Sequence, residues 1–297
     1  MRQPTRSRQP STRILLPDAG AATFLRACIA RDSRGCALEG PALLNRFPAN
    51  SHCIIVWFLE GRVDLLAAGG QEGRTPLARC VVGGCQSAPV TSENQGDVHG
   101  FIAMFYPDAF HALFGVDLAL LHNRFVDARE VLPPHGLALV EAVFVASGDD
   151  ERRRCVEEFI QLHGRAGHLP AWTRMRRLGG RLTLGLASAM LGVGPRQLQR
   201  VALREAGASL QTTLRLWRGE RSFLRAQRQH LAGRPVAMAE HALDSDYADQ
   251  SHMVRECRAQ TGRTPLQLAR DVQCEEADWI YRLELPLEED TPPTRPA

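Results

Sequence analysis

The sequence predicts an α+β chain in which a small β-barrel or sandwich with following helices precedes an all-α segment. Short β-branched and aromatic runs separated by glycine turns continue as far as Tyr106 and are typical of an all-β module. Beyond Trp172 these runs stop, and apolar residues recur with the period of a helix. There, a unit of helix, tight turn, helix and glycine stop occurs twice, about 55 residues apart.

Length and composition allow about two domains of ordinary size, because the chain has 297 residues and 44% of them are hydrophobic. The longest apolar run, Cys53–Leu59, is far shorter than the ~18 residues that span a bilayer. Pro4 and Pro10 interrupt any amino-terminal leader. We therefore expect a cytoplasmic protein with no membrane partner. The eight cysteines form no CxxC pair and are expected to be reduced thiols.

The first 20 residues are expected to be a disordered tail, and residues 21–165 a folded β-rich module. Within it, Cys53–Leu59 reads as a strand that turns back into a partner strand at Val63–Ala67. Val98–Tyr106 alternates well enough for a half-buried strand. Helices follow at Pro107–Phe114, Pro134–Ala146 and Asp150–His163, and Gly164–Pro170 has the composition of a linker.

Residues 170–275 are predicted to be all-α. Proline begins a helix and glycine ends it at several points, with Thr183 as one N-cap. Residues 276–297 are acidic and proline-rich and are expected to be a disordered tail. The predicted helices of the two units and their connection are Leu184–Leu191, Pro195–Ala206, Leu210–Leu231, Val236–Leu243 and Asp249–Thr261, followed by a last short helix after Pro265.

Charge is distributed unevenly along the chain, whose formal net charge is only +3. All 36 basic residues are arginines. The segment from Trp172 to Asp271 carries 17 arginines against 8 acidic residues, whereas the residues before it are nearly neutral and those after it are acidic. A strongly cationic stretch of this kind indicates a polyanionic partner.

The second helix of each unit has two different faces. In the first unit Leu198, Val201 and Ala202 are expected to pack on the preceding helix, and in the second unit Met253, Val254 and Cys257 do the same. Arginine and glutamine side chains, which can contact guanine and adenine edges bidentately, occupy the opposite faces. Such a face on one helix is usually only solvated, but its recurrence inside the cationic segment favours DNA recognition. The polar faces comprise Arg196, Gln199, Arg200 and Arg204 in the first unit, and Gln250, Ser251, Arg255 and Arg258 in the second.

Two motifs resemble the AraC family of bacterial transcription regulators. Asp249–Arg255 (DQSHMVR) followed by Thr261–Pro265 (TGRTP) resembles the family's second helix-turn-helix signature, and Leu191–Arg200 is similar to its first unit. The resemblance covers about residues 181–270. It implies two recognition helices joined by a long helix, which read successive major grooves of double-stranded DNA. It assigns base or groove contacts to Arg196, Gln199, Arg200, Gln250, Ser251 and Arg255, with Arg204 on the same face, and phosphate contacts near Ser209 and Thr264.

The chain departs from this family pattern at several positions. Ala202, Met253 and Cys257 stand where the family usually has aromatic residues, so we expect both small cores to be less filled. Asp246 stands where glycine is usual, and we expect the turn to survive because Asp tolerates a left-handed backbone. Gly219 interrupts the connecting helix, at an expected cost of about 1 kcal/mol relative to alanine.

The family resemblance also extends to the amino-terminal module. Phe105–Gly115 (FYPDAFHALFG) is similar to a segment of cupin-like domains that sense a ligand or dimerise in this family. His52, Trp57 and Arg62 are weak candidates for binding a small-molecule effector. Because His52, His99 and His111 are isolated in the sequence and no HxH motif occurs, we expect no metal and no cofactor.

These observations lead to one preferred function and two alternatives. The preferred one is a sequence-specific transcription regulator, an activator by family analogy, with RNA polymerase as a further partner and a homodimer left open. The first alternative is a cupin-like small-molecule-binding protein or enzyme with a helical partner-binding appendage. The second is an adaptor whose helix-turn-helix units bind protein. The absence of GxSxG, HExxH, P-loop and GxGxxG motifs favours a non-enzyme.

Overall fold

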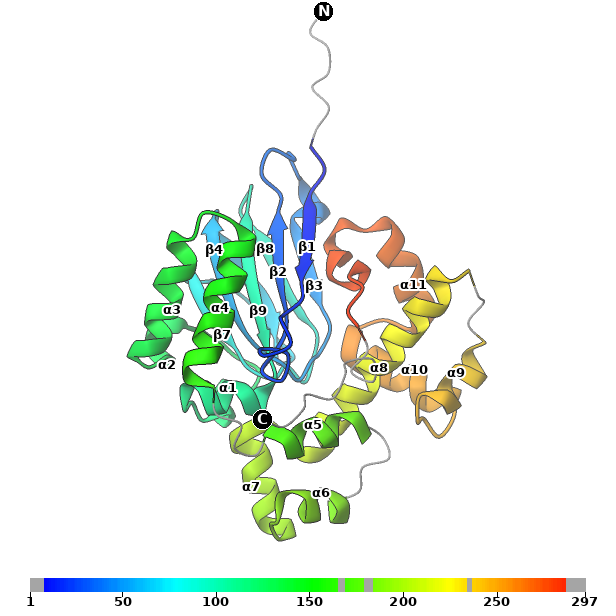
Figure 1. Ribbon diagram of the computed structural model, residues 1–297. Coiled ribbons are helices and arrows are strands. Elements are labelled where there is room, and N and C mark those ends of the chain that lie inside the picture. The colour runs from blue at the N-terminus through cyan, green and yellow to red at the C-terminus, as the bar shows by residue number, and fades with distance from the viewer. Residues whose placement is uncertain (1–7, 165–168, 179–183, 234–236, 287–297) are drawn as a thin grey trace, which may run out of the picture.

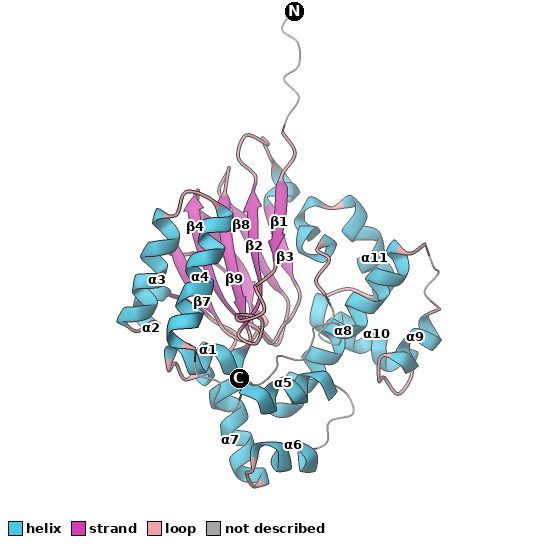
Figure 2. Ribbon diagram, viewed as in Figure 1, coloured by secondary structure: helices cyan, strands magenta, loops and turns pink. Residues whose placement is uncertain are grey.

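Two antiparallel sheets and two groups of helices make up the computed structural model, which describes residues 8–164, 169–178, 184–233 and 237–286 (Figures 1 and 2). In the described part of the chain no strand belongs to both sheets, so the strands form a sandwich and the barrel alternative is wrong. The larger sheet has the order β1 (Ser11–Leu15), β2 (Leu25–Asp32), β9 (His99–Phe105), β4 (Cys53–Glu60), β7 (Cys80–Gly83), β10 (Phe125–Asp127). The smaller has the order β3 (Leu44–Phe47), β8 (Val90–Asn94), β5 (Val63–Ala68), β6 (Gln71–Pro76).

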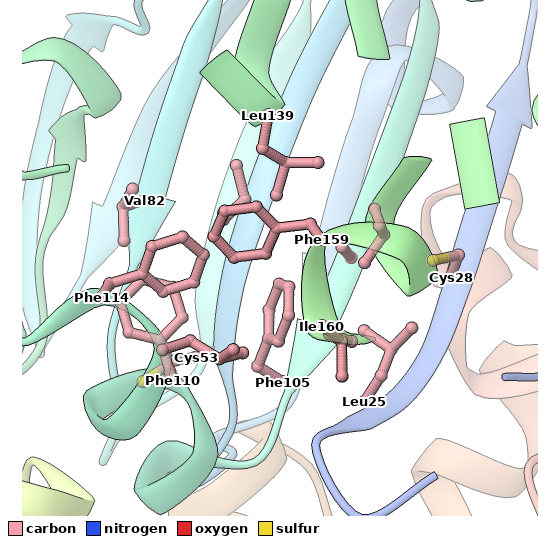
Figure 3. Packing of buried hydrophobic residues seen from close by; sticks show 14 of the residues in the cluster. Leu25, Cys28, Cys53, Val82, Phe105, Phe110, Phe114, Leu139, Phe159 and Ile160 are labelled. Atoms are coloured by element: carbon pink, nitrogen blue, oxygen red, sulfur yellow. The ribbon is translucent and has the colours of Figure 1, made fainter. Parts of the chain in front are cut away.

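One face of the larger sheet packs against the helices that follow it in sequence. These are α1 (Pro107–Phe114), α2 (Ala128–Val131), α3 (Pro134–Val145) and α4 (Asp149–His163), with the short turn η2 (Leu118–Leu121) between the first two. Phe105, Phe110, Phe114 and Phe159 meet in this core (Figure 3), and the rings of Phe110 and Phe114 lie 4.5 Å apart. The alternating pattern of β9 places Phe101, Ala103 and Phe105 on this covered face.

The first strand corrects the expected disordered tail of 20 residues. Ser11–Leu15 pairs antiparallel with Cys28–Asp32 and forms the edge of the larger sheet. The composition of this segment is polar, but its backbone groups gain a complete partner strand, and Leu15 is buried. Residues 1–7 of the predicted tail lie outside the described residues.

The helices of the second half follow the predicted ranges closely. The structure has α5 (Leu169–Leu178), α6 (Leu184–Leu191), α7 (Pro195–Ala206), α8 (Leu210–Leu231), α9 (Met238–Asp244), α10 (Gln250–Thr261) and α11 (Pro265–Cys274). Gly207 and Gly262 end α7 and α10 in the left-handed conformation, and Asp246 has φ +61°, as its tolerance of that backbone predicts. The predicted N-cap Thr183 lies outside the described residues.

The segment after α11 corrects the expected disordered carboxyl-terminal tail. Glu276–Arg282 forms the 3₁₀ segment η4, in which Asp278, Trp279 and Tyr281 are buried. Composition does not predict this because the burial is provided by the distant strand β3, on which η4 packs. Residues 287–297 lie outside the described part of the chain.

Polar contacts join the helical half to the sandwich. Arg176 of α5 donates to Asp108 of α1 over 2.7 Å, both side chains are 3% exposed, and the guanidinium lies 3.8 Å from the ring centroid of Tyr106. Burial raises the pKa of Asp108, and the Arg176 guanidinium opposes that rise. On α8, Glu220 pairs with the buried Arg26 of β2 at 3.4 Å. The two halves are therefore held by charges shielded from solvent.

Gly219 has a different role from the one the sequence predicts. A Cβ atom at this position in α8 would lie 1.8 Å from Oε1 of Gln260, so the missing side chain lets α10 approach α8. Gln260 is buried, and its amide donates to the Arg215 carbonyl at 3.2 Å. Its own carbonyl accepts a 2.8 Å hydrogen bond from the amide of Ala49 in the sandwich. Gly219 is thus a packing requirement where three elements meet.

Replacing Gly219 with alanine is expected to lower the free energy of unfolding by about 1–3 kcal/mol, because the added methyl group displaces Gln260. Gly185 of α6 is a matched control: it is also helical, but a Cβ there meets nothing within 4 Å. Gly185→Ala should leave stability unchanged or raise it by up to about 1 kcal/mol. Urea titration followed by circular dichroism measures both, and equal effects of the two substitutions would contradict the packing role.

Candidate functional site

The first helix-turn-helix unit consists of α6 and α7 with a tight turn at Gly192, whose φ is +66°. Leu198 and Ala202 are fully buried against α6 and α5, as the apolar face of α7 predicts. Trp172 of α5 lies in the same cluster beside Ala202, and its indole donates to Glu205 at 3.1 Å. A large aromatic residue from outside the unit therefore packs in the cluster that contains the small Ala202.

The second unit consists of α9 and α10. Asp249 caps α10, because its carboxylate accepts a 2.7 Å hydrogen bond from the amide of His252. The buried cluster of this unit contains Ala242, Tyr247 and Met253. It is smaller than the cluster of the first unit, and Cys257 is only partly buried at its edge. The capped amino-terminal turn of α10 leaves its first side chains exposed.

The residues predicted to contact bases all lie on the surface of the two second helices. All are exposed, and within the described residues Arg204 is the one of the four arginines that forms an ion pair, with the neighbouring Glu205 at 2.8 Å. The guanidinium and amide groups are thus available to an external partner. The exposed residues are Arg196, Gln199, Arg200 and Arg204 on α7, and Gln250, Ser251 and Arg255 on α10.

The two residues predicted near phosphates occupy equivalent positions in the repeat. Ser209 caps α8 two residues after Gly207, and Thr264 caps α11 two residues after Gly262. Each side chain accepts a hydrogen bond from its own helix, and Thr264 forms a complete capping box with Gln267. Ser209 is exposed and Thr264 is half-buried, and backbone N–H groups at the start of a helix suit phosphate oxygens.

A cavity of about 620 Å³ lies between the sandwich and the helical half. Its sandwich wall is the second face of β4 and β9, opposite the aromatic core, together with β5 of the smaller sheet. Its other wall comes from α8, α10, α11 and η4. The lining is mostly apolar, and includes Ile54, Val56, Phe58, Leu65, Ile102 and Met104 on the sandwich side and Phe223, Leu268, Ile280 and Leu283 on the helical side.

His52 is the one sequence-predicted ligand residue that lines this cavity. Its side chain is 4% exposed and lies 3.9 Å from Glu220, and burial lowers the pKa of its imidazole. Among the described residues its Nδ1 atom has no hydrogen-bond partner. Trp57 points into the aromatic core instead, where its indole donates to the Val140 carbonyl, and Arg62 is exposed at the turn between β4 and β5.

Sequence reasoning missed the helical wall of the cavity, because residues such as Phe223 and Leu283 come from elements far from the strands. The strand wall was signalled by the continuous apolar run of β4, whose two faces are both covered. No group of three His, Cys, Asp or Glu residues suited to a metal ion occurs in the described ranges. No described helix is long and apolar enough to cross a membrane.

The chain matches one family model, a helix-turn-helix domain, at residues 187–271. This range begins in α6 and ends in α11, so it contains both units and the whole connecting helix. No curated protein is similar enough to match the chain.

Solved structures with some likeness include ToxT from Vibrio cholerae and the AraC-like transcriptional activator CuxR. The unsaturated fatty acid-bound ToxT is 9% identical with TM-score 0.42, and the match covers 90% of this chain and 96% of that one. ToxT bound to (E)-4-(8-methylnaphthalen-1-yl)but-3-enoic acid is 9% identical with TM-score 0.41, over 75% and 96%. CuxR is 11% identical with TM-score 0.26, over 74% and 96%.

The signature residues of the second unit, the doubled helix-turn-helix geometry and the family match agree with one another. Asp249 and Gly262 occupy the N-cap and left-handed stop that the motif requires, and the two second helices expose their arginines. Residues 187–271 form a helix-turn-helix domain, and its second unit carries a signature that resembles that of the AraC family.

Proposed function

We propose that the protein binds a specific DNA operator with α7 and α10 in successive major-groove turns, about 34 Å apart. The observation that carries this proposal is the pair of exposed faces, rich in arginine and glutamine, at matching positions of a repeated unit. Two such faces within a segment of strong positive charge suit one duplex better than a protein surface. Regulators of this family are normally not enzymes, and no catalytic role is proposed.

The individual contacts follow from side-chain chemistry. Arg200 and Arg255 lie on the exposed faces with no ion pair in the described structure, and each can donate two of its guanidinium N–H groups to O6 and N7 of guanine. Gln199 and Gln250 can make the corresponding amide contacts with adenine. Ser209 and Thr264 position the two units by way of phosphates at the starts of α8 and α11.

The amino-terminal module is proposed to bind a small apolar effector in the cavity. A volume of about 620 Å³ is in the range of small-molecule sites, and the surface of the cavity is mostly apolar, with His52 and Glu220 among its polar residues. Because α8 and α10 form part of the wall, a ligand contacts the DNA-binding domain directly. The domain boundaries expected from the sequence, at residues 165–170 and 275, are retained as part of this proposal.

Activation of transcription, contact with RNA polymerase and a homodimer complete the proposed function by family resemblance. Genomic footprinting of the tagged protein in its host tests the whole proposal, because it reports bound sites and neighbouring genes together. Discrete sites that share a two-part sequence motif are the expected result. Uniform background across the genome would overturn the proposed function.

Arg200→Ala and Arg255→Ala are each expected to weaken specific binding by ~1–3 kcal/mol without unfolding the protein, because each removes a base contact from an exposed position. Arg129→Ala is the matched control, since Arg129 is an exposed arginine of the sandwich module. Fluorescence anisotropy with a footprinted site measures all three. Equal losses for all three variants would indicate a general charge effect and contradict base recognition.

Apolar compounds that enter the cavity are expected to stabilise the protein by about 2.7 kcal/mol when present at 100 times their dissociation constant. Thermal unfolding in the presence of n-alkanols of increasing chain length measures this. Ile102→Trp fills part of the cavity and should abolish the shift, whereas Val145→Trp at an exposed site should preserve it. A shift that persists in the Ile102→Trp variant would place the binding elsewhere.

A further inference from the structure

The residues that follow the matched domain form a strap, here defined as Glu275–Pro286, that bridges the DNA-binding domain and the sandwich. On the sandwich side Trp279 is 4% exposed, and its indole donates to Asn45 at 2.9 Å. Its ring meets Phe47 edge-on at 5.7 Å, and the guanidinium of Arg31 lies 5.1 Å from its centroid. Composition alone predicts a disordered tail, but in the folded chain this segment is packed against the sandwich.

On the side of the DNA-binding domain the strap engages one arginine. Asp278 is fully buried, and its carboxylate accepts two hydrogen bonds from the guanidinium of Arg263, at 2.6 and 2.7 Å. The same guanidinium lies 5.4 Å from the ring centroid of Tyr281, whose carbonyl accepts a 3.1 Å hydrogen bond from Gln227 of α8. A bidentate pair of this geometry is the arrangement by which arginine also grips a phosphate.

Arg263 stands where the second unit is expected to meet the DNA backbone. It lies between the left-handed Gly262 that ends α10 and the N-cap Thr264 that begins α11. The equivalent position of the first unit, between Gly207 and Ser209, is the buried Ala208. The second unit therefore has an extra cation beside this helix start, and the cation is held by Asp278 of the strap and, at 3.5 Å, by Asp271 of α11.

Charge on the strap has the sign that competes with DNA. It carries Glu275, Glu276, Asp278 and Glu284 against the single Arg282, and it packs on β3 and α11. Glu276 reaches back to Arg31 of the sandwich, and Asp278 also faces Arg46 at 3.4 Å. Asp278 is thus the strap carboxylate that occupies an arginine of the second unit, at a place where a phosphate would add to the binding of that unit.

We propose that the strap is an autoinhibitory element in which Asp278 substitutes for a DNA phosphate on Arg263. Release of the strap removes the bidentate partner of Arg263 and leaves only its 3.5 Å contact with Asp271, so that the guanidinium can contact the backbone next to Thr264. This inference rests on the proposed function, since it presumes that the second unit binds duplex DNA. It is specific to the strap and does not depend on the operator sequence.

Asp278→Asn in the full chain is the direct test, with a mixed-sequence duplex as the probe and affinity measured across a salt series. The expected result is tighter binding, by up to about tenfold at 0.1 M salt, and a log–log salt slope steeper by about 0.9, the value for one additional phosphate contact. Arg263→Gln alone should change neither quantity, because the guanidinium is already occupied. Arg263→Gln in the Asp278→Asn background should remove the gain.

Glu284→Gln is the matched control, because it removes one exposed negative charge from the same strap without touching Arg263. It should give a much smaller gain than Asp278→Asn. Trp279→Ala loosens the strap from the sandwich side and should give a gain of the same sign, which keeps the proposal testable if Asp278→Asn fails to fold. Folded Asp278→Asn and Trp279→Ala variants with unchanged or weaker binding would overturn the strap's role. Absence of any duplex binding by the parent chain would instead overturn the proposed function.

Discussion

The buried ion pair between Arg176 and Asp108 is the constraint on which the relation of the two halves depends. Each side chain is 3% exposed, so neither charge can be left without its partner at small cost. Breaking such a pair leaves an uncompensated buried charge, which costs about 3–5 kcal/mol. Since Arg176 lies on α5, which packs on α6 and α7, the pair fixes the first helix-turn-helix unit against the sandwich.

The larger sheet has a second face that helices α1, α3 and α4 do not cover. Helices α1, α3 and α4 cover one face of β4 and β9, and Figure 1 shows α8–α11 on the other side of the sandwich. The smaller sheet covers part of the remaining apolar face, where Val63 packs with Val56 and Phe58, and the helix-turn-helix domain closes the rest, with a cavity between them. Helix α10 contributes Met253, Cys257 and Gln260 to the wall of this cavity, whereas no residue of α7 lines it.

The second helix-turn-helix unit has a smaller buried core than the first unit. Contacts with elements outside the unit add to its stability. Its buried cluster is small, with Met253 and Cys257 where the family has aromatic residues, but Gln260 binds α8 and Ala49, and the strap closes over Arg263. Contacts to the sandwich thus compensate for limited packing within the unit. A unit stabilised in this way is sensitive to any event that moves the strap or the cavity wall.

Local sequence signals determined the helical half and the fold class. Pro195, Gly207, Asp249 and Gly262 mark helix starts and stops through their own backbone preferences, so α7 and α10 begin and end as predicted, to within one residue. The exposed arginines followed from helix periodicity alone. Of the ligand candidates on or beside β4, His52 lines the cavity and Trp57 lies in the aromatic core, because alternation along a strand does not tell which covered face surrounds a cavity.

The tertiary structure decided the features whose cause lies far away in the chain. Ser11–Leu15 is a strand because its backbone pairs with the edge of β2. Trp279 is buried because it hydrogen-bonds to Asn45 and packs edge-on against Phe47. From the sequence, Gly219 is expected only to destabilise its helix. In the folded chain the side chain of Gln260 occupies the space that a Cβ atom at Gly219 would take. Periodicity and capping report on residues within one or two turns, whereas pairing, cavities and close helix contacts depend on partners that only the folded chain brings together.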